Sequence, residues 1–194
     1  TGKPLVPSRW PAVTAATVAF GHGLAASPLH LAAAYATIAN DGRRVRPTLV
    51  HRKEPVQGEQ VLSPKAAKQA RDLLRHVVTK GTAKAAEVAG YQVGGKTGTA
   101  DKPRPGGGYY KNRNVSTFAS MYPTDHPEYV LVVTLDEPKV SAAGGGEMRT
   151  AGATAAPVAA ALIQRLSPML GAAAMALSSV SVIANASRLR GVKL

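Results

Sequence analysis

Apolar residues recur at helical spacing behind two serine–proline pairs. Ser27-Pro28 and Ser63-Pro64 each supply a residue that caps a helix N-terminus and a proline that fits the first turn. The apolar positions that follow lie on one helical face in each case: Leu31, Ala32, Tyr35, Ile38 and Ala39, then Ala67, Ala70, Leu73, Leu74, Val77 and Val78. The pattern therefore predicts two amphipathic helices, which end at Gly42 and Gly81.

Three stretches in the second half of the chain have the pattern of strands. Residues 91–100 and 115–122 alternate apolar with polar or small side chains, as half-buried strands do. Residues 129–136 form a nearly continuous apolar run, which is typical of a central strand. Because a short turn at 123–127 joins the last two stretches, we expect an antiparallel meander.

Other segments lack a clear period. Residues 1–26 contain several prolines and are expected to form a loop. Residues 46–62 are expected to form a small hairpin around a polar tip. Glycine and proline predict two long loops, over residues 101–114 and 136–146, and loops of that length are often functional.

A third helix is expected near the end of the folded region. It starts around Thr154, carries Pro157 in its first turn and ends at Pro168, and its apolar face contains Val158, Leu162 and Leu166. This order of elements predicts an α/β protein of the α+β type, with an antiparallel sheet covered by helices. We expect one domain over residues 1–167 and a weakly ordered extension over 168–194, whose alanine and serine content does not favour membrane insertion.

Charge and residue content narrow the possible partners. The chain has a formal net charge of +13 at pH 7 and a pI near 10.3. The basic residues are spread along the chain without a nucleic-acid-binding motif, so an acidic cell-wall polymer or an anionic lipid surface explains the charge as well as nucleic acid does. The chain has no cysteine, and its five histidines lack metal-ligand spacing. We expect no metal and no other cofactor.

The most informative stretch lies in the first predicted strand, where residues 94–100 read GGKTGTA. Glycine inside a strand often marks a place where a ligand or another backbone comes close. Because side chains alternate between faces, Thr97 and Thr99 point to one face of the sheet, and Lys96 points to the other face or along the edge. A cation, two hydroxyls and unhindered backbone N–H groups suit an anionic substrate that carries a carbonyl group.

Several stretches together resemble the C-terminal half of the transpeptidase domain of class B penicillin-binding proteins, nearest to the septal cell-division enzymes of Gram-negative bacteria. Residues 20–32 (FGHGLAASPLHLA) are similar to the family pattern F-G-x-G-x-x-x-T/S-P-L-Q-L-A, with histidine at two positions where the family has other residues. Residues 34–42, the Lys-Thr-Gly element at 96–98 and the residues AAPV at 155–158 follow the family in order and spacing.

The resemblance implies serine acyl transfer between peptidoglycan stem peptides, and binding of penicillin. In this reaction Lys96 would add positive potential and help proton movement, and the backbone N–H of Thr99 would be an oxyanion donor. The hydroxyls of Thr97 and Thr99 would hold the terminal carboxylate of the substrate. Gly95 and Gly98 would let the substrate lie against the strand.

The resemblance also implies partners and a location. The partners would be stem peptides, β-lactam antibiotics and divisome membrane proteins, with no nucleic acid. The location would be the periplasmic side of the bacterial inner membrane, through an N-terminal anchor outside this chain. The two loops at 101–114 and 136–147 would flank the cleft.

Two family elements have no counterpart in the sequence. No serine is followed three residues later by lysine, so the nucleophile of the S-x-x-K element is absent, and the S-x-N element is absent too. We therefore expect the chain alone to be inactive, and, because it does not begin with methionine, to be processed or part of something larger. Two alternatives remain: a serine β-lactamase or penicillin sensor, and a basic non-enzymatic module that binds anionic polymer or nucleic acid.

Overall fold

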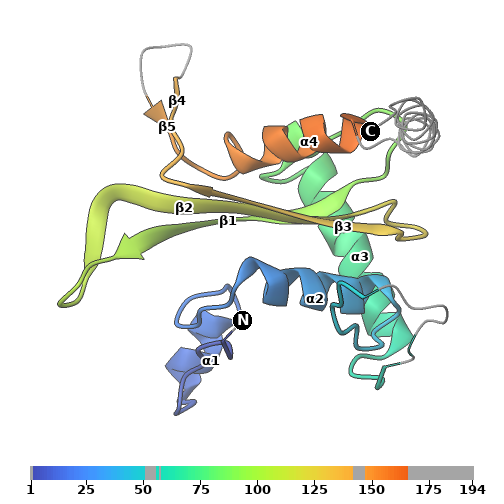
Figure 1. The fold of residues 1–194 in the computed structure, drawn as a ribbon, viewed down its shortest axis with the longest axis horizontal. Helices are drawn as coiled ribbons and strands as arrows, with labels where there is room; N and C mark the ends of the chain where they lie inside the picture. The colour runs from blue at the N-terminus through green and yellow to red at the C-terminus, as the bar shows by residue number, and fades with distance from the viewer. Residues whose placement is uncertain (1, 51–55, 57, 142–146, 166–194) are drawn as a thin grey trace, which may run out of the picture.

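A three-stranded antiparallel sheet lies between two layers of helices in the computed structural model (Figure 1). The structure describes residues 2–50, 56, 58–141 and 147–165. Helix α2 (Pro28–Ala39) covers one face of the sheet and α4 (Ala155–Arg165) covers the other, while α3 (Pro64–Thr79) contacts the start of the first strand. The expected α+β class, an antiparallel sheet covered by helices, is confirmed. The extension expected over 168–194 lies outside the described residues.

The sheet has the order β1-β2-β3, formed by Gly94–Pro103, Tyr109–Tyr122 and Tyr129–Asp136. Lys96 pairs with Ala119, and Thr99 pairs with Ser116. The meander is therefore as predicted, but the position of the apolar strand is wrong. Within the described residues β3 lies at one edge and β2 at the centre, because β2 pairs on both sides while β3 pairs only with β2.

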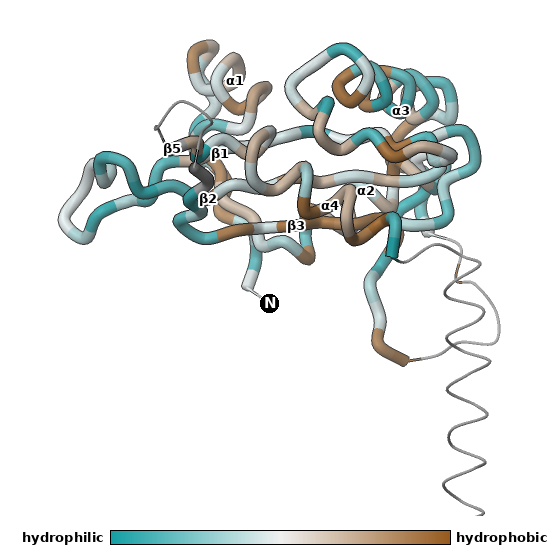
Figure 2. The backbone as a smooth tube through the Cα atoms, turned by 90° about the horizontal axis from the view of Figure 1, so that it is seen from above, coloured by the Kyte–Doolittle hydropathy of each residue, from teal (hydrophilic) through white to brown (hydrophobic). Residues whose placement is uncertain are grey.

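The loop predicted over residues 101–114 is mostly strand. Pro103 pairs with Tyr109, so β1 and β2 continue beyond the helices as a long hairpin that turns at residues 104–108. Gly106, Gly107 and Gly108 all have positive φ angles, which glycine accommodates without steric cost. The glycines thus belong to a tight turn rather than to a long loop, and Figure 2 shows this hairpin as a largely hydrophilic segment.

The two predicted helices and their caps are confirmed. The Ser27 hydroxyl accepts a hydrogen bond from the His30 amide at the start of α2, and the Ser63 hydroxyl accepts one from the Ala66 amide at the start of α3. Along α3 one expected core residue, Leu73, is instead 68% exposed.

The face of the third helix is not the predicted one. Val158 and Leu162 are 39% and 38% exposed, and Leu166 lies outside the described residues. The buried side chains of α4 are mainly small: Ala155, Ala156, Ala159, Ala160 and Ile163. Alanine lets the helix approach the sheet closely, so that Phe118 and Val78 pack in the same core cluster. On the other face of the sheet, Tyr35 packs with Ala119 and Met121 in a second cluster.

Two connecting segments also differ from expectation. Residues 12–18 form α1 (Ala12–Val18), a helix without buried residues, inside the segment predicted as loop. The small hairpin expected over 46–62 is displaced, because Gly42 reverses the chain at φ +81° and pairing begins at once between Arg43 and Gln60. Part of that hairpin, residues 51–55 and 57, lies outside the described residues.

Short elements occupy the other two connections. A single 3₁₀ turn, η1 (Lys84–Ala86), follows α3 and contributes Ala86 to the core. The loop expected over 136–146 contains β4 (Val140–Ser141), which pairs with β5 (Glu147–Met148), while residues 142–146 are not described. In the part of the chain that the structure covers, each helix is too short or too polar to span a bilayer.

Candidate functional site

The Lys96–Thr99 segment lies on an edge strand. Among the described residues β1 pairs only with β2, so its other edge presents backbone N–H and C=O groups without a strand partner. Side chains alternate as the sequence predicts: Thr97 and Thr99 point toward the α4 layer, and Lys96 lies on the face of its pairing partner Ala119, which packs in the α2 cluster.

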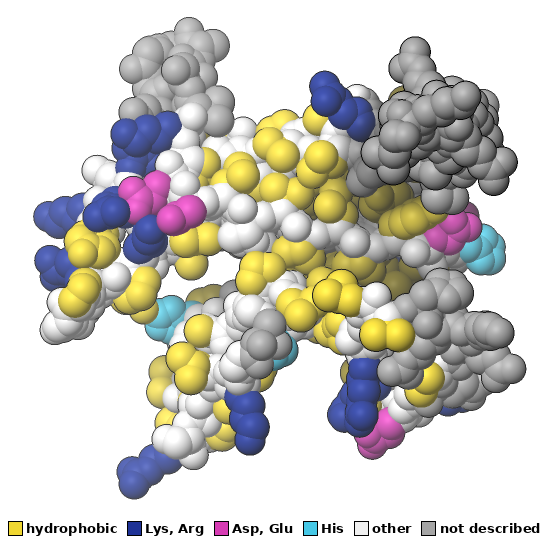
Figure 3. Space-filling model, in the orientation of Figure 1, with side chains coloured by type: hydrophobic (Ala, Val, Ile, Leu, Met, Phe, Trp, Pro, Cys, Tyr) yellow, Lys and Arg dark blue, Asp and Glu magenta, His cyan; other side chains and the backbone are white. Residues whose placement is uncertain are grey.

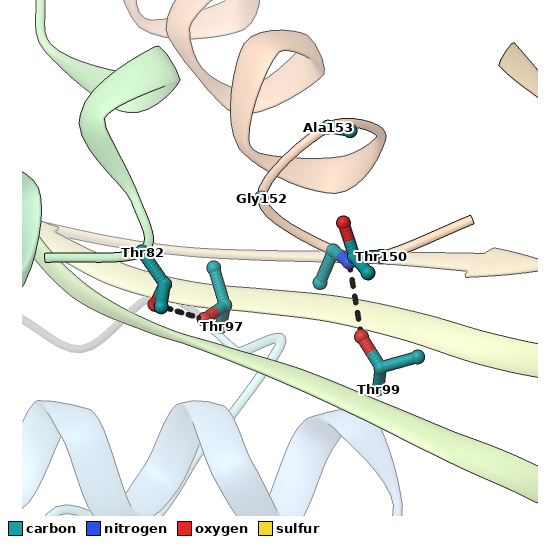
Figure 4. A pocket seen from close by; sticks show the side chains of 7 residues that line it. Thr82, Thr97, Thr99, Thr150, Gly152 and Ala153 are labelled. Carbon is teal, nitrogen blue, oxygen red and sulfur yellow. Dashed lines mark hydrogen bonds between the residues drawn. The ribbon is translucent and has the colours of Figure 1, made fainter. Parts of the chain in front are cut away.

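Both threonine hydroxyls have protein partners. The Thr97 Oγ1 lies 2.7 Å from the Thr82 Oγ1, and the Thr99 Oγ1 accepts a hydrogen bond of 3.0 Å from the Ala151 amide (Figure 4). Thr82 follows α3, and Ala151 precedes α4, so three segments far apart in sequence meet here. They line a pocket of about 480 Å³, formed by Thr82, Thr97, Thr99, Thr150, Ala151, Gly152 and Ala153.

The proton of the Thr99 hydroxyl is not used by this contact. A hydroxyl has one donor and two acceptor lone pairs, and a backbone amide can only donate. Because the Ala151 amide occupies an acceptor position of Thr99, the Thr99 O–H can still donate to another group. Thr99 is also exposed, so that group can be a ligand. An anion, which accepts hydrogen bonds without donating them, suits this arrangement.

Gly95 and Gly98 of β1 have different surroundings. A Cβ at Gly95 would lie 2.5 Å from the Ala119 carbonyl oxygen and 2.6 Å from the Phe118 ring, so this position is filled by the core. A Cβ at Gly98 would meet no atom within 4 Å. Gly98 therefore leaves the surface of β1 bare where a ligand could lie, whereas Gly95 is required by packing.

Lys96 supplies an exposed positive charge. Its Nζ donates a hydrogen bond of 2.8 Å to the Thr97 carbonyl oxygen. No carboxylate of the described residues forms an ion pair with it. Positive potential close to the free edge of β1 favours an anionic ligand.

A cluster of charges fixes the base of the β1–β2 hairpin. Lys102 contacts Asp136 at 2.9 Å and Glu137 at 2.8 Å, and Arg113 contacts Glu137 at 2.7 Å. The pKa of Glu137 is lowered to about 2, mainly by the hydrogen bond from Arg113 and secondly by the hydrogen bond from Lys102. Figure 3 shows Lys and Arg side chains gathered with acidic ones on this side of the molecule. The cluster links Lys102 of β1 and Arg113 of β2 to the end of β3, just beyond Thr99.

Sequence reasoning missed Thr82 and Ala151. Neither residue lies in a recognised motif, and both reach β1 only through the packing of α3 and α4. The loop expected over 101–114 to flank the cleft is a hairpin that projects past the helices, and the second loop is only partly described. Within the described residues no group of three or more His, Asp or Glu side chains could hold a metal ion.

Comparison with known proteins identifies the family. Residues 1–164 match the penicillin binding protein transpeptidase domain. The chain is 38% identical over 182 residues to the probable peptidoglycan D,D-transpeptidase FtsI of Caulobacter vibrioides, covering 88% of this chain and 31% of that protein. It is 35% identical over 179 residues to the penicillin-binding protein PbpB of Mycolicibacterium smegmatis, covering 81% and 27%. The chain thus spans about a third of the length of these relatives.

Solved structures agree with this assignment. The apo transpeptidase domain of Burkholderia pseudomallei penicillin-binding protein 3 superposes with a TM-score of 0.69 at 35% identity, covering 82% of this chain and 48% of that one. The Mycobacterium tuberculosis penicillin-binding protein 3, complexed with aztreonam, gives a TM-score of 0.70 at 33% identity, covering 85% and 41%. The chain therefore belongs to the penicillin binding protein transpeptidase family and forms part of a class B transpeptidase domain of the FtsI and PBP3 type.

Proposed function

We propose that the chain forms the substrate-binding part of a penicillin-sensitive peptidoglycan D,D-transpeptidase that acts in septal cell-wall synthesis. The observation that carries the proposal is the arrangement on β1: an unpaired strand edge, two hydroxyls on one face and an exposed lysine. A peptide can add to such an edge through main-chain hydrogen bonds. The hydroxyls then select a ligand that ends in a carboxylate.

The reaction is acyl transfer in two steps. A serine oxygen attacks the carbonyl carbon of the D-Ala-D-Ala peptide bond of a stem peptide. The C–N bond breaks, and D-alanine leaves with the proton that the serine hydroxyl lost. An amine of a second stem peptide then attacks the acyl-enzyme, forms the cross-link and releases the serine. Penicillin acylates the same serine.

Four residues of β1 have roles in this scheme. The backbone N–H of Thr99 donates to the oxyanion that forms when the carbonyl is attacked. The Thr97 and Thr99 hydroxyls bind the terminal carboxylate, and Lys96 adds positive potential and assists proton movement. Gly98 leaves space for the substrate backbone. Gly95, which we expected to face the substrate, is better explained by the Phe118 ring that fills its surroundings.

The remaining catalytic groups come from outside the chain. No S-x-x-K or S-x-N element is present in its sequence, so the attacking serine and its base belong to the other part of the domain. We further propose that the complete protein works on the periplasmic side of the inner membrane, in contact with divisome membrane proteins and with β-lactams as inhibitors. In this proposal residues 1–167 are the domain part and the remainder an extension.

Covalent labelling by penicillin tests the division of roles. The isolated chain, incubated with a fluorescent penicillin, is expected to give no covalent adduct, and an acyl adduct detected by mass spectrometry would disprove the absence of a nucleophile. A second sample replaces the matching part of the Burkholderia pseudomallei transpeptidase domain with residues 1–165. This chimera is expected to be acylated, and its Lys96→Met variant much more slowly. A chimera that folds, as judged by circular dichroism, and is never acylated would contradict the substrate-binding role.

A further inference from the structure

Among the residues that the structure describes, the Thr82 hydroxyl is the hydrogen-bond partner of the Thr97 hydroxyl. From this contact we propose that Thr82 is a positioning residue: its O–H donates to the Thr97 Oγ1 and leaves the Thr97 proton free for the carboxylate of a peptide ligand. The inference rests on the proposed function, and it adds a residue that no part of the Lys-Thr-Gly motif includes.

The direction of this hydrogen bond follows from what each hydroxyl must do. At 2.7 Å the two oxygens share one proton, which either residue can supply. If Thr97 donated to Thr82, its only proton would be used, and it would present lone pairs to an incoming carboxylate. If Thr82 donates, Thr97 keeps its proton for the ligand. A bound anion favours the arrangement in which Thr82 donates, because the anion can then accept the Thr97 proton.

Thr99 has the same arrangement with a backbone donor. The Ala151 amide can only donate, so this contact leaves the Thr99 proton for another acceptor. Among the described residues no backbone amide donates to the Thr97 hydroxyl, so Thr97 depends on the Thr82 hydroxyl for the equivalent contact. With Thr82 donating, both hydroxyls on this face of β1 accept one protein hydrogen bond and offer one proton, and a carboxylate has two oxygens to receive them.

The backbone around Thr82 is held by the end of α3. The amides of Gly81 and Ala83 both donate to the Val77 carbonyl oxygen, at 3.0 and 3.2 Å, and the Ala83 side chain is fully buried. The backbone at Gly152, just before α4, lies so close to Thr82 that a Cβ at Gly152 would collide with the Thr82 carbonyl oxygen. The Thr82 hydroxyl therefore has a fixed origin on the protein, although the side chain itself is exposed.

A binding experiment on the 194-residue chain tests this role. The probes are N-acetyl-D-Ala-D-Ala and its C-terminal amide, titrated while the amide resonances of residues 96–100 are followed by nuclear magnetic resonance. The wild-type chain is expected to bind the acid more tightly than the amide. Thr82→Val, which keeps the shape and removes the hydroxyl, should lower this preference about three- to ten-fold, because one hydrogen bond to the site is no longer oriented. Thr82→Ser should restore it.

Two further measurements separate positioning from other roles. Thr97→Val and the double variant Thr82→Val/Thr97→Val should have the same preference, since Thr82 acts only through Thr97. An additional loss in the double variant would mean that Thr82 contacts the ligand directly and would overturn the proposal. In Thr82→Val, the affinity for the C-terminal amide probe and the unfolding temperature should change little from the wild type. If Thr82→Val is unstable, Thr82→Ala provides a second variant without the hydroxyl.

The outcomes distinguish this inference from the function on which it rests. If the wild-type chain shows no preference for the acid, the proposed carboxylate site is wrong and the role of Thr82 falls with it. If the wild-type chain prefers the acid and Thr82→Val retains the full preference, the carboxylate site stands and the positioning role is refuted. If Thr82→Ser loses as much as Thr82→Val, a hydroxyl at this position is not sufficient for the preference, and the positioning role is refuted.

Discussion

Two glycines of β1 allow the same substitution to be tested in opposite surroundings. Gly95 and Gly98 are three residues apart on one strand, and neither has a positive φ angle, so alanine fits the backbone at both. At Gly95 the new methyl group would lie 2.5 Å from the Ala119 carbonyl oxygen and 2.6 Å from the Phe118 ring. Neither neighbour can move easily, because the first is sheet backbone and the second is a fully buried side chain.

The expected cost follows from these contacts. Overpacking a filled core typically costs about 1–3 kcal/mol, and replacing glycine returns about 0.4–1 kcal/mol by restricting the unfolded chain. Gly95→Ala should therefore lower the free energy of unfolding by about 1–2 kcal/mol, which corresponds to a fall of about 2–8 °C in melting temperature for a chain of this size. At Gly98 the overpacking cost is absent, so Gly98→Ala should leave the melting temperature unchanged or raise it slightly.

Ligand binding should show the reverse order. The methyl group of Gly98→Ala stands on the bare part of β1 and would obstruct a peptide there, which should weaken the binding of N-acetyl-D-Ala-D-Ala about ten-fold. Thermal unfolding followed by circular dichroism and the peptide titration described above measure the two effects on the same samples. Equal destabilisation by both substitutions, or a Gly95→Ala variant as stable as the wild type, would refute the assignment of Gly95 to packing and Gly98 to the ligand.

Two other predictions concern the supports of the site. Ile163→Ala should lower the free energy of unfolding, measured by urea titration, by about 2–4 kcal/mol, because this α4 side chain is fully buried. Leu162→Ala should cost under about 1 kcal/mol, because the neighbouring Leu162 side chain is 38% exposed. Similar losses in the two variants would contradict the observed orientation of α4. Because its cationic partners lower the pKa of Glu137 from its ordinary 4.5 to about 2, its contribution to stability should be complete above pH 4.5 and lost as the pH falls toward 2. In the Glu137→Gln variant, the urea midpoint of unfolding should fall less than in the wild type as the pH is lowered through that range. If the two proteins have the same pH profile, the ion pairs of Glu137 do not contribute to stability.

Local interactions were the predictable part of the fold. The caps at Ser27 and Ser63 act over three residues, so the sequence contains all the information that they require. The strands of the meander could be predicted because alternation reports which side chains are buried. The long hairpin could not, because its extension beyond residue 100 depends on ion pairs such as that of Lys102 with Glu137, which are 35 residues apart. The edge position of β3 depends on which strands are present in the chain, which its own composition does not reveal.

The site divides in the same way. That Thr97 and Thr99 share a face of β1 follows from strand geometry alone. That each hydroxyl meets a particular partner, Thr82 at a separation of 15 residues and Ala151 at 52, depends on where two helices end and begin in space. No periodicity in the sequence carries that information. The structure therefore adds to the motif the groups that determine how its hydroxyls point.

Alanine in the core explains how those partners reach β1. The core between η1 and α4 is built largely of alanine, with Ala83, Ala86, Ala155 and Ala159 all fully buried. Larger side chains at these positions would separate α4 from the end of α3 and from the sheet by the width of the added atoms. The Ala151 amide would then lose its 3.0 Å contact with Thr99, and Thr82 its 2.7 Å contact with Thr97. Small residues distant from the Lys-Thr-Gly strand are therefore a condition for the contacts that its two hydroxyls make with the protein.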